Sequence, residues 1–263
     1  MVSEDRNFDD IADKLTRRIY GSLKGEIRLA VLARDLLPLV DAAGRERPLE
    51  ILDAGGGVGQ FGATLAARGH RIVHCDISAR MLEKARAHYA AQAPAAEVRF
   101  IHGPMQSLGA YELPPFDLIL CHAVVEWLAD PRETLAALTG RLRPGGLMST
   151  LFYNRYSLMM LYLLRGRFDK LTSERIAGWG NSLTPTNPQA PETVFGWFDD
   201  WGFETVCRSG VRCFHDYVPA RRREEWSREE IVAAELKVSR IEAFRSTARY
   251  IHLLSRKPST ENG

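Results

Sequence analysis

The sequence is poor in cysteine, and the few cysteines it has are not spaced to bind a metal. No Cys-x-x-Cys pair occurs among Cys75, Cys121, Cys207 and Cys213, whereas zinc sites and redox motifs usually have that spacing. Two of the four fall in segments that we expect to be buried strands. They are therefore predicted to be small core residues of a reduced, cytoplasmic protein, with no disulfide and no metal site.

Long apolar runs and targeting signals are also missing. The longest apolar segment near the middle of the chain, residues 158–164, is much shorter than the ~20 residues that span a bilayer. The first residues, MVSEDRNFDD, are acidic and lack the basic region and apolar core of a secretory signal. We therefore expect no membrane partner.

An excess of one charge is absent too. Lysine and arginine number 35 against 33 aspartates and glutamates, which leaves a net charge of +2. Such a balance permits contact with a polyanion without requiring it. With 263 residues, of which 45% are apolar, the chain is long enough for one substantial α/β domain with an elaborated cap.

Residues 49–60, LEILDAGGGVGQ, mark the point where a buried strand should give way to a helix. The apolar run before Asp53 is too short for a helix and predicts a central parallel strand. Gly55, Gly56 and the glycines after them allow backbone N–H groups to approach a ligand closely. The helix expected at 61–68 would direct its N-terminus at that ligand.

The loop after this strand can be compared with three glycine-rich patterns. It has no Gly-Lys-Ser or Gly-Lys-Thr, so a Walker-type phosphate loop is not indicated. Counted from Gly55, the dinucleotide pattern G-x-G-x-x-G fails at Gln60. What remains, D-x-G-G-G-x-G, resembles motif I of the class I S-adenosylmethionine-dependent methyltransferases, although the glycines of a plain turn would look the same.

Asp76 follows the next expected strand, 71–75, seventeen positions after Gly59. An acidic residue at this point of a Rossmann-like sheet can accept hydrogen bonds from a ribose diol. That would hold for a nicotinamide enzyme as well, so Asp76 alone does not identify the cofactor. A purely local role as helix N-cap is the weaker alternative, because Ser78 can cap the following helix itself.

Strands and helices alternate from residue 49 onward. We expect strands at 49–53, 71–75, 97–102, 116–121 and 147–152, separated by helices at 59–68, 78–92 and 130–142. This alternation implies right-handed crossovers and a parallel sheet with helices on both faces. The turn L-x-P-G-G before the last of these strands is a second resemblance to class I methyltransferases.

The flanking segments complete the predicted architecture. Helices are expected at 7–19, 23–40, 156–164, 191–201 and 224–243, strands at 202–210 and 249–255, and a long loop at 166–190. The resemblance implies a Rossmann-like class I methyltransferase fold, with a mostly parallel sheet of seven strands and the last strand inserted antiparallel. We predict one methyltransferase domain, 1–263, comprising a helical cap (1–45), a cofactor-binding core (46–156), a lid or loop insertion (157–190) and a C-terminal, substrate-side half that completes the sheet (191–263).

Three further stretches narrow the resemblance to one family. These are DRNFDDIADK with the later I-Y-G-x-x-K-G-x-x-R, then L-x-H-A-V-x-E-W-x-A-D-P, and finally G-V-R-x-F-H-D-Y with R-Y-I-H. Together they are similar to the bacterial tRNA 5-carboxymethoxyuridine methyltransferases over nearly the whole chain. The resemblance implies transfer of a methyl group from S-adenosylmethionine to the carboxylate of 5-carboxymethoxyuridine at the wobble position, with the tRNA anticodon stem-loop as partner.

The same resemblance implies the cofactor-binding residues. Gly55 and Gly56 would approach the methionine part of S-adenosylmethionine and Asp76 the ribose, Met105 and Gln106 would flank adenine, and His122 and Arg28 would lie near the methionine end. Without it, His122 is as easily a pocket-edge histidine, and Arg28 a solvated helix charge. No catalytic acid or base is nominated, because a carboxylate with a pKa of roughly 3 to 4 is already ionised at neutral pH.

Substrate contacts are less defined by the sequence. Arg212, His215 and Tyr217 form a polar cluster that could hold a carboxylate or phosphate, but a local pair of Asp216 with Arg212 explains it equally well. Residues 221–223 are three arginines, which the two glutamates after them can neutralise. The loop 170–185 lacks the lysine run expected of a close relative, which leaves Lys170, Arg175 and Trp179. A small-molecule methyltransferase and a non-catalytic cofactor-binding module remain alternative functions.

Overall fold

The structure is a computed structural model, and it describes residues 4–10, 12, 21–173, 176–177 and 184–259. Within these residues, one sheet crosses the molecule with the strand order β3-β2-β1-β4-β5-β7-β6. The strands are β1 (Glu50–Ala54), β2 (Arg71–Asp76), β3 (Val98–His102), β4 (Phe116–His122), β5 (Leu142–Tyr153), β6 (Glu204–Val211) and β7 (Tyr250–Arg256).

The direction of the strands confirms the predicted fold class. β1 to β5 pair in parallel, whereas β7 lies antiparallel between β5 and β6. The carboxyl ends of the other six strands and the beginning of β7 therefore meet at one edge of the sheet. Ligands of open α/β sheets bind beyond this edge.

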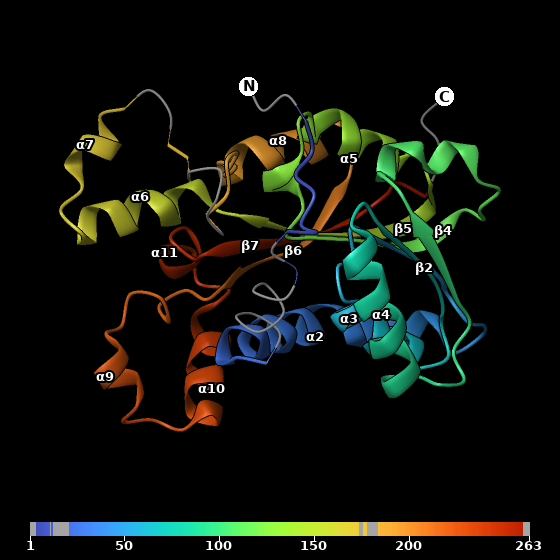
Figure 1. Cartoon of the computed structure of the whole chain (residues 1–263), viewed down its shortest axis with the longest axis horizontal. Helices are drawn as coiled ribbons and strands as arrows, with labels where there is room; N and C mark the ends of the chain where they lie inside the picture. Colours follow the sequence, from blue (N-terminus) through green and yellow to red (C-terminus); the bar gives the residue numbers. More distant parts are fainter. Residues whose placement is uncertain (1–3, 11, 13–20, 174–175, 178–183, 260–263) are drawn as a thin grey trace.

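Helices cover both faces of the sheet (Figure 1). In chain order they are α2 (Leu23–Ala43), α3 (Gln60–Ala66), α4 (Ala79–Gln92), the short 3₁₀ helices η2 (Met105–Ala110) and η3 (Val125–Trp127), α5 (Pro131–Thr139), α6 (Arg155–Leu164), α7 (Phe168–Leu171), α8 (Pro191–Asp200), α9 (Ala220–Arg223), α10 (Arg228–Val238) and α11 (Glu242–Arg245). Apolar side chains of α2, α3 and α4 form one core cluster with the sheet, and those of α5 and α8 form another on the opposite face.

The predicted amphipathic helix at 23–40 is confirmed and runs on to Ala43 as α2. Ile27, Val31 and Leu36 are fully buried, at intervals of four and five residues, so a single stripe of the helix faces the core. α2 packs on β6 and β7 and against α10. This position brings Arg28 to the ligand-binding edge of the sheet.

The predicted boundaries are wrong in two parts of the chain, for identifiable reasons. α5 ends at Thr139 and β5 begins at Leu142, because the Arg-Pro-Gly-Gly turn is a bulge inside β5, with Gly145 at a φ of +74°. The helix predicted at 224–243 is shorter: α10 begins at Arg228 and ends at Val238, and α11 is a separate short helix. Ser227 and Glu230 form a capping box at the start of α10 that fixes its first turn.

The remaining segments agree with the sequence only in part. The loop predicted at 166–190 contains the short helix α7, and most of the helix predicted at 7–19 lies outside the described residues. All four cysteines are free thiols, and three of them are buried. Among the described residues, no helix combines the length and apolarity needed to cross a bilayer.

Candidate functional site

The glycine loop after β1 is tied to the end of β2. The backbone N–H of Gly57 donates to Oδ2 of Asp76, and that of Ser78 donates to Oδ1, both at 2.8 Å. Burial outweighs these two bonds and raises the pKa of Asp76 above its usual value. The Ser78 hydroxyl accepts from the Met81 N–H and caps α4. Asp76 is thus held at the strand end with further lone pairs available.

Gly55 and Gly56 are needed for different contacts. A Cβ on Gly55, which has a φ of +68°, would come within 2.7 Å of Val124 and 3.1 Å of Met105, both of which line a cavity at the carboxyl edge of the sheet. A Cβ on Gly56 would lie 2.4 Å from His74 and 2.5 Å from Asp53, beneath the loop. Gly56 accordingly faces a smaller neighbouring cavity.

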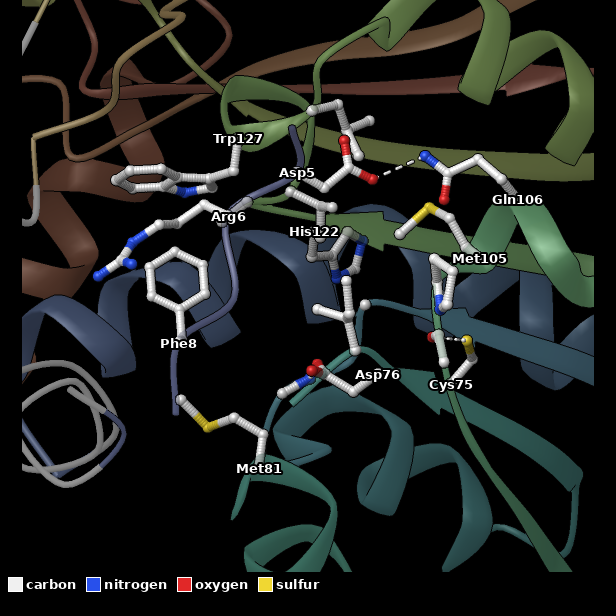
Figure 2. A pocket seen from close by; sticks show the side chains of 18 of the residues that line it. Asp5, Arg6, Phe8, Cys75, Asp76, Met81, Met105, Gln106, His122 and Trp127 are labelled. Atoms are coloured by element: carbon white, nitrogen blue, oxygen red, sulfur yellow. Dashed lines mark hydrogen bonds between the residues drawn. The ribbon is translucent and has the colours of Figure 1, made fainter. Parts of the chain in front are cut away.

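The main cavity gathers six of the seven predicted cofactor residues. Arg28, Gly55, Asp76, Met105, Gln106 and His122 all line it. In Figure 2, Met105 and Gln106 lie on one side and Asp76 below, with His122 between them and the opposite wall. These side chains come from α2, β2, η2 and β4 together with the β1–α3 loop. The structure therefore brings together residues that are separated by up to 94 positions in the sequence.

Sequence reasoning did not assign the N-terminal segment to the cavity wall. Phe8 packs edge-on against Trp127 with ring centroids 5.0 Å apart, and Asp5 accepts a 2.8 Å hydrogen bond from the Ala129 N–H. Asp5 and Phe8 both line the cavity, and Phe8 lies with Trp127 on the side opposite Met105 (Figure 2). The stretch DRNFDD contributed to the family resemblance, but no local pattern says that it folds back over a site.

Gln106 is partly committed to this segment. Its side-chain N–H₂ donates to Asp5 at 2.8 Å and to Thr134 at 3.1 Å. Its side-chain carbonyl and its backbone remain the groups with which it could contact a ligand. Met105 beside it is 9% exposed and presents its thioether to the cavity.

Arg28 is a nearly buried cation without an ionic partner. Its side chain is 9% exposed, and the guanidinium lies 5.1 Å from the centre of the Tyr250 ring. Among the described residues it makes no hydrogen bond or ion pair. A buried arginine in this state is costly unless an anion completes it.

Glu126 is a buried acidic residue behind the cavity lining, next in sequence to Trp127. The residue is fully buried, and neither carboxylate oxygen has a hydrogen-bond partner within the described residues. Burial raises the pKa of Glu126 to about 7, while the nearby backbone N–H groups of Glu126 and Tyr153 and the charge of Arg28 act in the opposite direction. Arg28 in the cavity and Glu126 behind it are thus two ionisable groups without an ion pair among the described residues.

His122 is both satisfied and exposed to the cavity. Its Nε2 lies 2.7 Å from the Ser149 hydroxyl, while the ring lines the cavity. Burial and the positive charge of Arg28 lower the pKa of His122 well below the usual value, so the imidazole is neutral. The two alternatives drawn from the sequence are therefore not exclusive.

The cluster predicted for the substrate is engaged in local ion pairs. Asp216 binds Arg212 and also accepts from Arg249 Nε at 3.0 Å, and Arg249 donates to Tyr153 Oη at 2.6 Å. The pairing of Asp216 with Arg212 that the sequence allowed is thus present. The Tyr217 hydroxyl donates to the Thr247 carbonyl at 2.6 Å.

The other predicted substrate residues are placed as follows. Arg222 pairs with Glu225 at 3.0 Å, as the sequence suggested for this run. Arg223 donates to the backbone carbonyl of His215, and the His215 residue is 5% exposed. Arg175 and Trp179 lie outside the described residues, and Lys170 lies within the short helix α7.

Known proteins resemble this chain in sequence and in fold. Residues 52–150 match the family model described as a methyltransferase domain. The chain is 39% identical to the tRNA 5-carboxymethoxyuridine methyltransferase of Escherichia coli (strain K12), over 98% of this chain and 99% of that protein. A trans-aconitate 2-methyltransferase from Deinococcus radiodurans is 38% identical over 44% of this chain and 42% of its own length.

Solved structures share the fold at low sequence identity. Magnesium protoporphyrin IX methyltransferase from Synechocystis PCC 6803 with bound SAH superposes with a TM-score of 0.64 at 15% identity, covering 95% of this chain and 96% of that one. The structure named "a putative sarcosine dimethylglycine methyltransferase" from Galdieria sulphuraria gives a TM-score of 0.57 at 17% identity, covering 89% of this chain and 86% of that one. At such identities the likeness shows a common fold.

Proposed function

We propose a reaction for this chain from the premise that it belongs to the tRNA 5-carboxymethoxyuridine methyltransferase family. It transfers the methyl group of S-adenosylmethionine to the carboxylate of 5-carboxymethoxyuridine at the tRNA wobble position, and the product is the methyl ester. The observation that carries the proposal is the 39% identity over 98% of the chain. This span includes the N-terminal segment that closes the cavity, not only the methyltransferase core.

The cavity fits S-adenosylmethionine in three respects. Arg28 is a buried cation without a partner, which suits the cofactor carboxylate as a charge-assisted, two-pronged donor. Asp76 stands at the end of β2 with free lone pairs for ribose hydroxyls. The backbone at Gly55 has no room for a side chain, so a ligand there contacts the main chain directly.

Two residues support the adenine and methionine positions. Met105 offers a polarisable side chain to a flat ring, and Gln106 retains its carbonyl oxygen and backbone for the base edge. His122 lies near the methionine end. When bound, the cofactor supplies an electrophilic methyl group on a sulfonium.

The substrate needs little chemical help from the protein. Its carboxylate has a pKa of roughly 3 to 4 and is ionised at neutral pH, so no residue has to remove a proton. The protein's task is to align the carboxylate oxygen and to exclude water. The packing of Phe8 on Trp127 closes one side of the cavity for this purpose.

A group of cations, Lys24, Arg212 and Arg249, surrounds Asp216 beyond Tyr250. This cationic edge supplies positive charge for an anionic substrate. Lys24 lies 3.8 Å from Asp216. Burial lowers the pKa of Lys24, and Arg212, Arg249 and Arg223 lower it further, while Asp216 is the carboxylate that raises it. The potential at Lys24 therefore remains positive after the local ion pairs have formed. We assign this edge to the carboxylate or a neighbouring phosphate of the tRNA.

Methyl transfer to RNA tests the proposal directly. The purified protein is incubated with labelled S-adenosylmethionine and tRNA from a strain that lacks this gene, and the RNA is then digested to nucleosides. We expect 5-carboxymethoxyuridine to gain the mass of one CH₂ group, with a label that mild base removes as an ester. Bound cofactor without transfer to RNA would instead favour a small carboxylic acid or quinone precursor as substrate.

A further inference from the structure

A chain of four side chains connects the interior of the molecule with the cavity. Asp35 Oδ2 lies 2.8 Å from His252 Nδ1, His252 Nε2 lies 2.9 Å from Ser149 Oγ, and Ser149 Oγ lies 2.7 Å from His122 Nε2. These residues come from α2, β7, β5 and β4. The first three are nearly or fully buried, and His122 lines the cavity.

The position of each proton in this hydrogen-bonded series is determined by Asp35, at its buried end. Although burial alone would raise it, the hydrogen bond from His252 and the contacts with Ser209 and Arg34 hold the pKa of Asp35 well below its usual range. Asp35 is therefore ionised and can only accept. His252 Nδ1 consequently carries a proton and donates it to Asp35.

The charge around Asp35 determines the state of His252. Oδ1 of Asp35 already accepts from Arg34 Nε at 2.9 Å and from Arg240 at 2.7 Å. Two guanidinium groups thus balance the carboxylate, and a further positive charge on His252 would be repelled. A single proton on His252, at Nδ1, satisfies this arrangement and leaves Nε2 as an acceptor for Ser149.

The same two arginines argue against a metal at this position. Ligand atoms of Asp35, Cys207 and His252 lie within 4.8 Å of one another. Burial raises the pKa of the Cys207 thiol to about 11, so it is a protonated, weak ligand, and a cation would meet Arg34 and Arg240. The group acts through hydrogen bonds instead.

Ser149 transmits the order of donors and acceptors from His252 to His122. A serine hydroxyl has a single proton, and His252 Nε2 can only accept it. The Ser149 oxygen must then accept from His122, so His122 Nε2 carries the proton. Nδ1 of the neutral His122 ring is left as a lone pair, and it has no partner among the described residues.

We infer that Asp35, His252 and Ser149 are positioning residues that hold His122 as the Nε2–H tautomer, so that its Nδ1 accepts a hydrogen bond from a protonated amine in the cavity. The ligand part of this inference rests on the proposed function. S-adenosylmethionine has such an amine beside its carboxylate. Arg28 and His122 then recognise the two opposite charges of one amino-acid end.

The tautomer can be measured without any ligand. Long-range ¹H–¹⁵N correlation spectra of protein with labelled histidine distinguish Nδ1–H from Nε2–H rings, and the His122 signals are those missing in His122→Asn. We expect His122 as Nε2–H and His252 as Nδ1–H. A His122 ring protonated at Nδ1 would overturn the inference.

Variants of the linking serine test the coupling. Ser149→Ala should release His122 into a mixture of tautomers, whereas Ser149→Thr, which keeps the hydroxyl, should restore the single form. Thr150→Val is the matched control, because it removes a neighbouring buried hydroxyl that has no hydrogen-bond partner among the described residues. An unchanged single tautomer in Ser149→Ala would contradict the role of Ser149.

Binding measurements test the amine. The wild type should bind S-adenosylhomocysteine about tenfold more tightly than its desamino analogue, and Ser149→Ala should lose most of this preference. Equal weakening of both ligands would mean that Ser149 is only structural. If S-adenosylhomocysteine does not bind the wild type, the cofactor proposal fails, whereas the ligand-free spectra still decide the tautomer.

Discussion

The cavity and the cationic edge beyond Tyr250 differ in how their charges are satisfied. Arg28 lines the cavity and makes no ion pair, and Glu126, buried behind it, has no side-chain hydrogen-bond partner among the described residues. At the edge, Arg212 and Arg249 share Asp216 and are nearly buried with it. Both regions carry buried arginine, but only the edge has a protein carboxylate in direct contact with it.

This difference separates stability from binding. A buried charge that is paired contributes to the folded state, because loss of its partner leaves a desolvated ion. A buried charge without a partner costs stability in the free protein and recovers that cost when a ligand arrives. Substitutions in the edge should therefore affect folding first, and substitutions in the cavity should affect ligand affinity first.

Asp216→Asn should give the largest change in folding stability. It leaves Arg212 and Arg249 buried without a carboxylate, which costs about 3–5 kcal/mol. Although burial alone would raise it, contacts with His215, Arg212 and Arg249 hold the pKa of Asp216 well below its usual range. The stabilisation is hence present above roughly pH 4 and is lost as the pH falls through the lowered pKa. Urea unfolding at pH 7 and at low pH measures both effects, and an equal loss at the two pH values would refute the pairing.

Glu126→Gln should change the pH dependence of stability in the opposite sense. The folded-state pKa of about 7 lies above the ordinary glutamate value of 4.5, so the folded protein binds the extra proton between these values. Stability of the wild type should fall as pH rises through this window, by on the order of 2–3 kcal/mol. Glutamine cannot ionise, and the variant should flatten that slope in pH-dependent thermal unfolding. A slope identical to that of the wild type would show that Glu126 is ionised in the folded state.

Gly55→Ala should impair both properties, because the loop is structural and faces the ligand. The added Cβ meets Val124 and Met105, and overpacking of this kind costs about 1–3 kcal/mol. Gly69→Ala is a suitable control. Gly69 also has a positive φ, +86°, but nothing lies within 4 Å of an added Cβ, so it reports the backbone cost alone. Thermal unfolding of the two variants should differ by the clash; equal destabilisation would remove the steric argument.

Arg28→Met should leave folding stability nearly unchanged and weaken the binding of the cofactor. Methionine removes an uncompensated buried cation and keeps apolar contact with Tyr250, so we expect less than ~1 kcal/mol in stability. Loss of charge-assisted hydrogen bonds should weaken S-adenosylhomocysteine binding by about 10- to 100-fold in calorimetry. Arg28→Lys should recover only part of this affinity. A strongly destabilised Arg28→Met with normal affinity would reverse the comparison between the two regions.

Much of the cavity could be predicted from the sequence because its residues belong to short local patterns. The glycine loop, Asp76 and His122 each end or follow a strand, and a parallel sheet brings those points to one edge. The seven strands, with the last one inserted antiparallel, also followed once the family resemblance was recognised. Arg28 came from the resemblance alone, since nothing in α2 distinguishes it from a surface charge.

What could not be predicted depends on contacts between distant segments. Phe8 packs on Trp127, and Asp35 reaches His252 across 217 positions. Neither contact leaves a periodic or local signal. The bulge inside β5 was missed because the Pro-Gly-Gly turn looks like a loop between elements, and the start of α10 was missed although Ser227 and Glu230 have capping-box spacing.

Lys24→Gln should give the smallest change, confined to RNA. Lys24 is partly exposed, with 42% of its side chain accessible, and it is the cation of the edge that Asp216 contacts least closely. We expect a few-fold weaker binding of tRNA and a salt dependence lower by about one counterion. Arg45→Gln removes an equal charge from an exposed turn after α2 and should change neither quantity. Binding of S-adenosylhomocysteine should be the same in both variants, because the edge lies outside the cofactor cavity. If both variants lower the salt dependence equally, the edge attracts RNA only through overall charge, and the carboxylate or phosphate assigned to it must be held elsewhere.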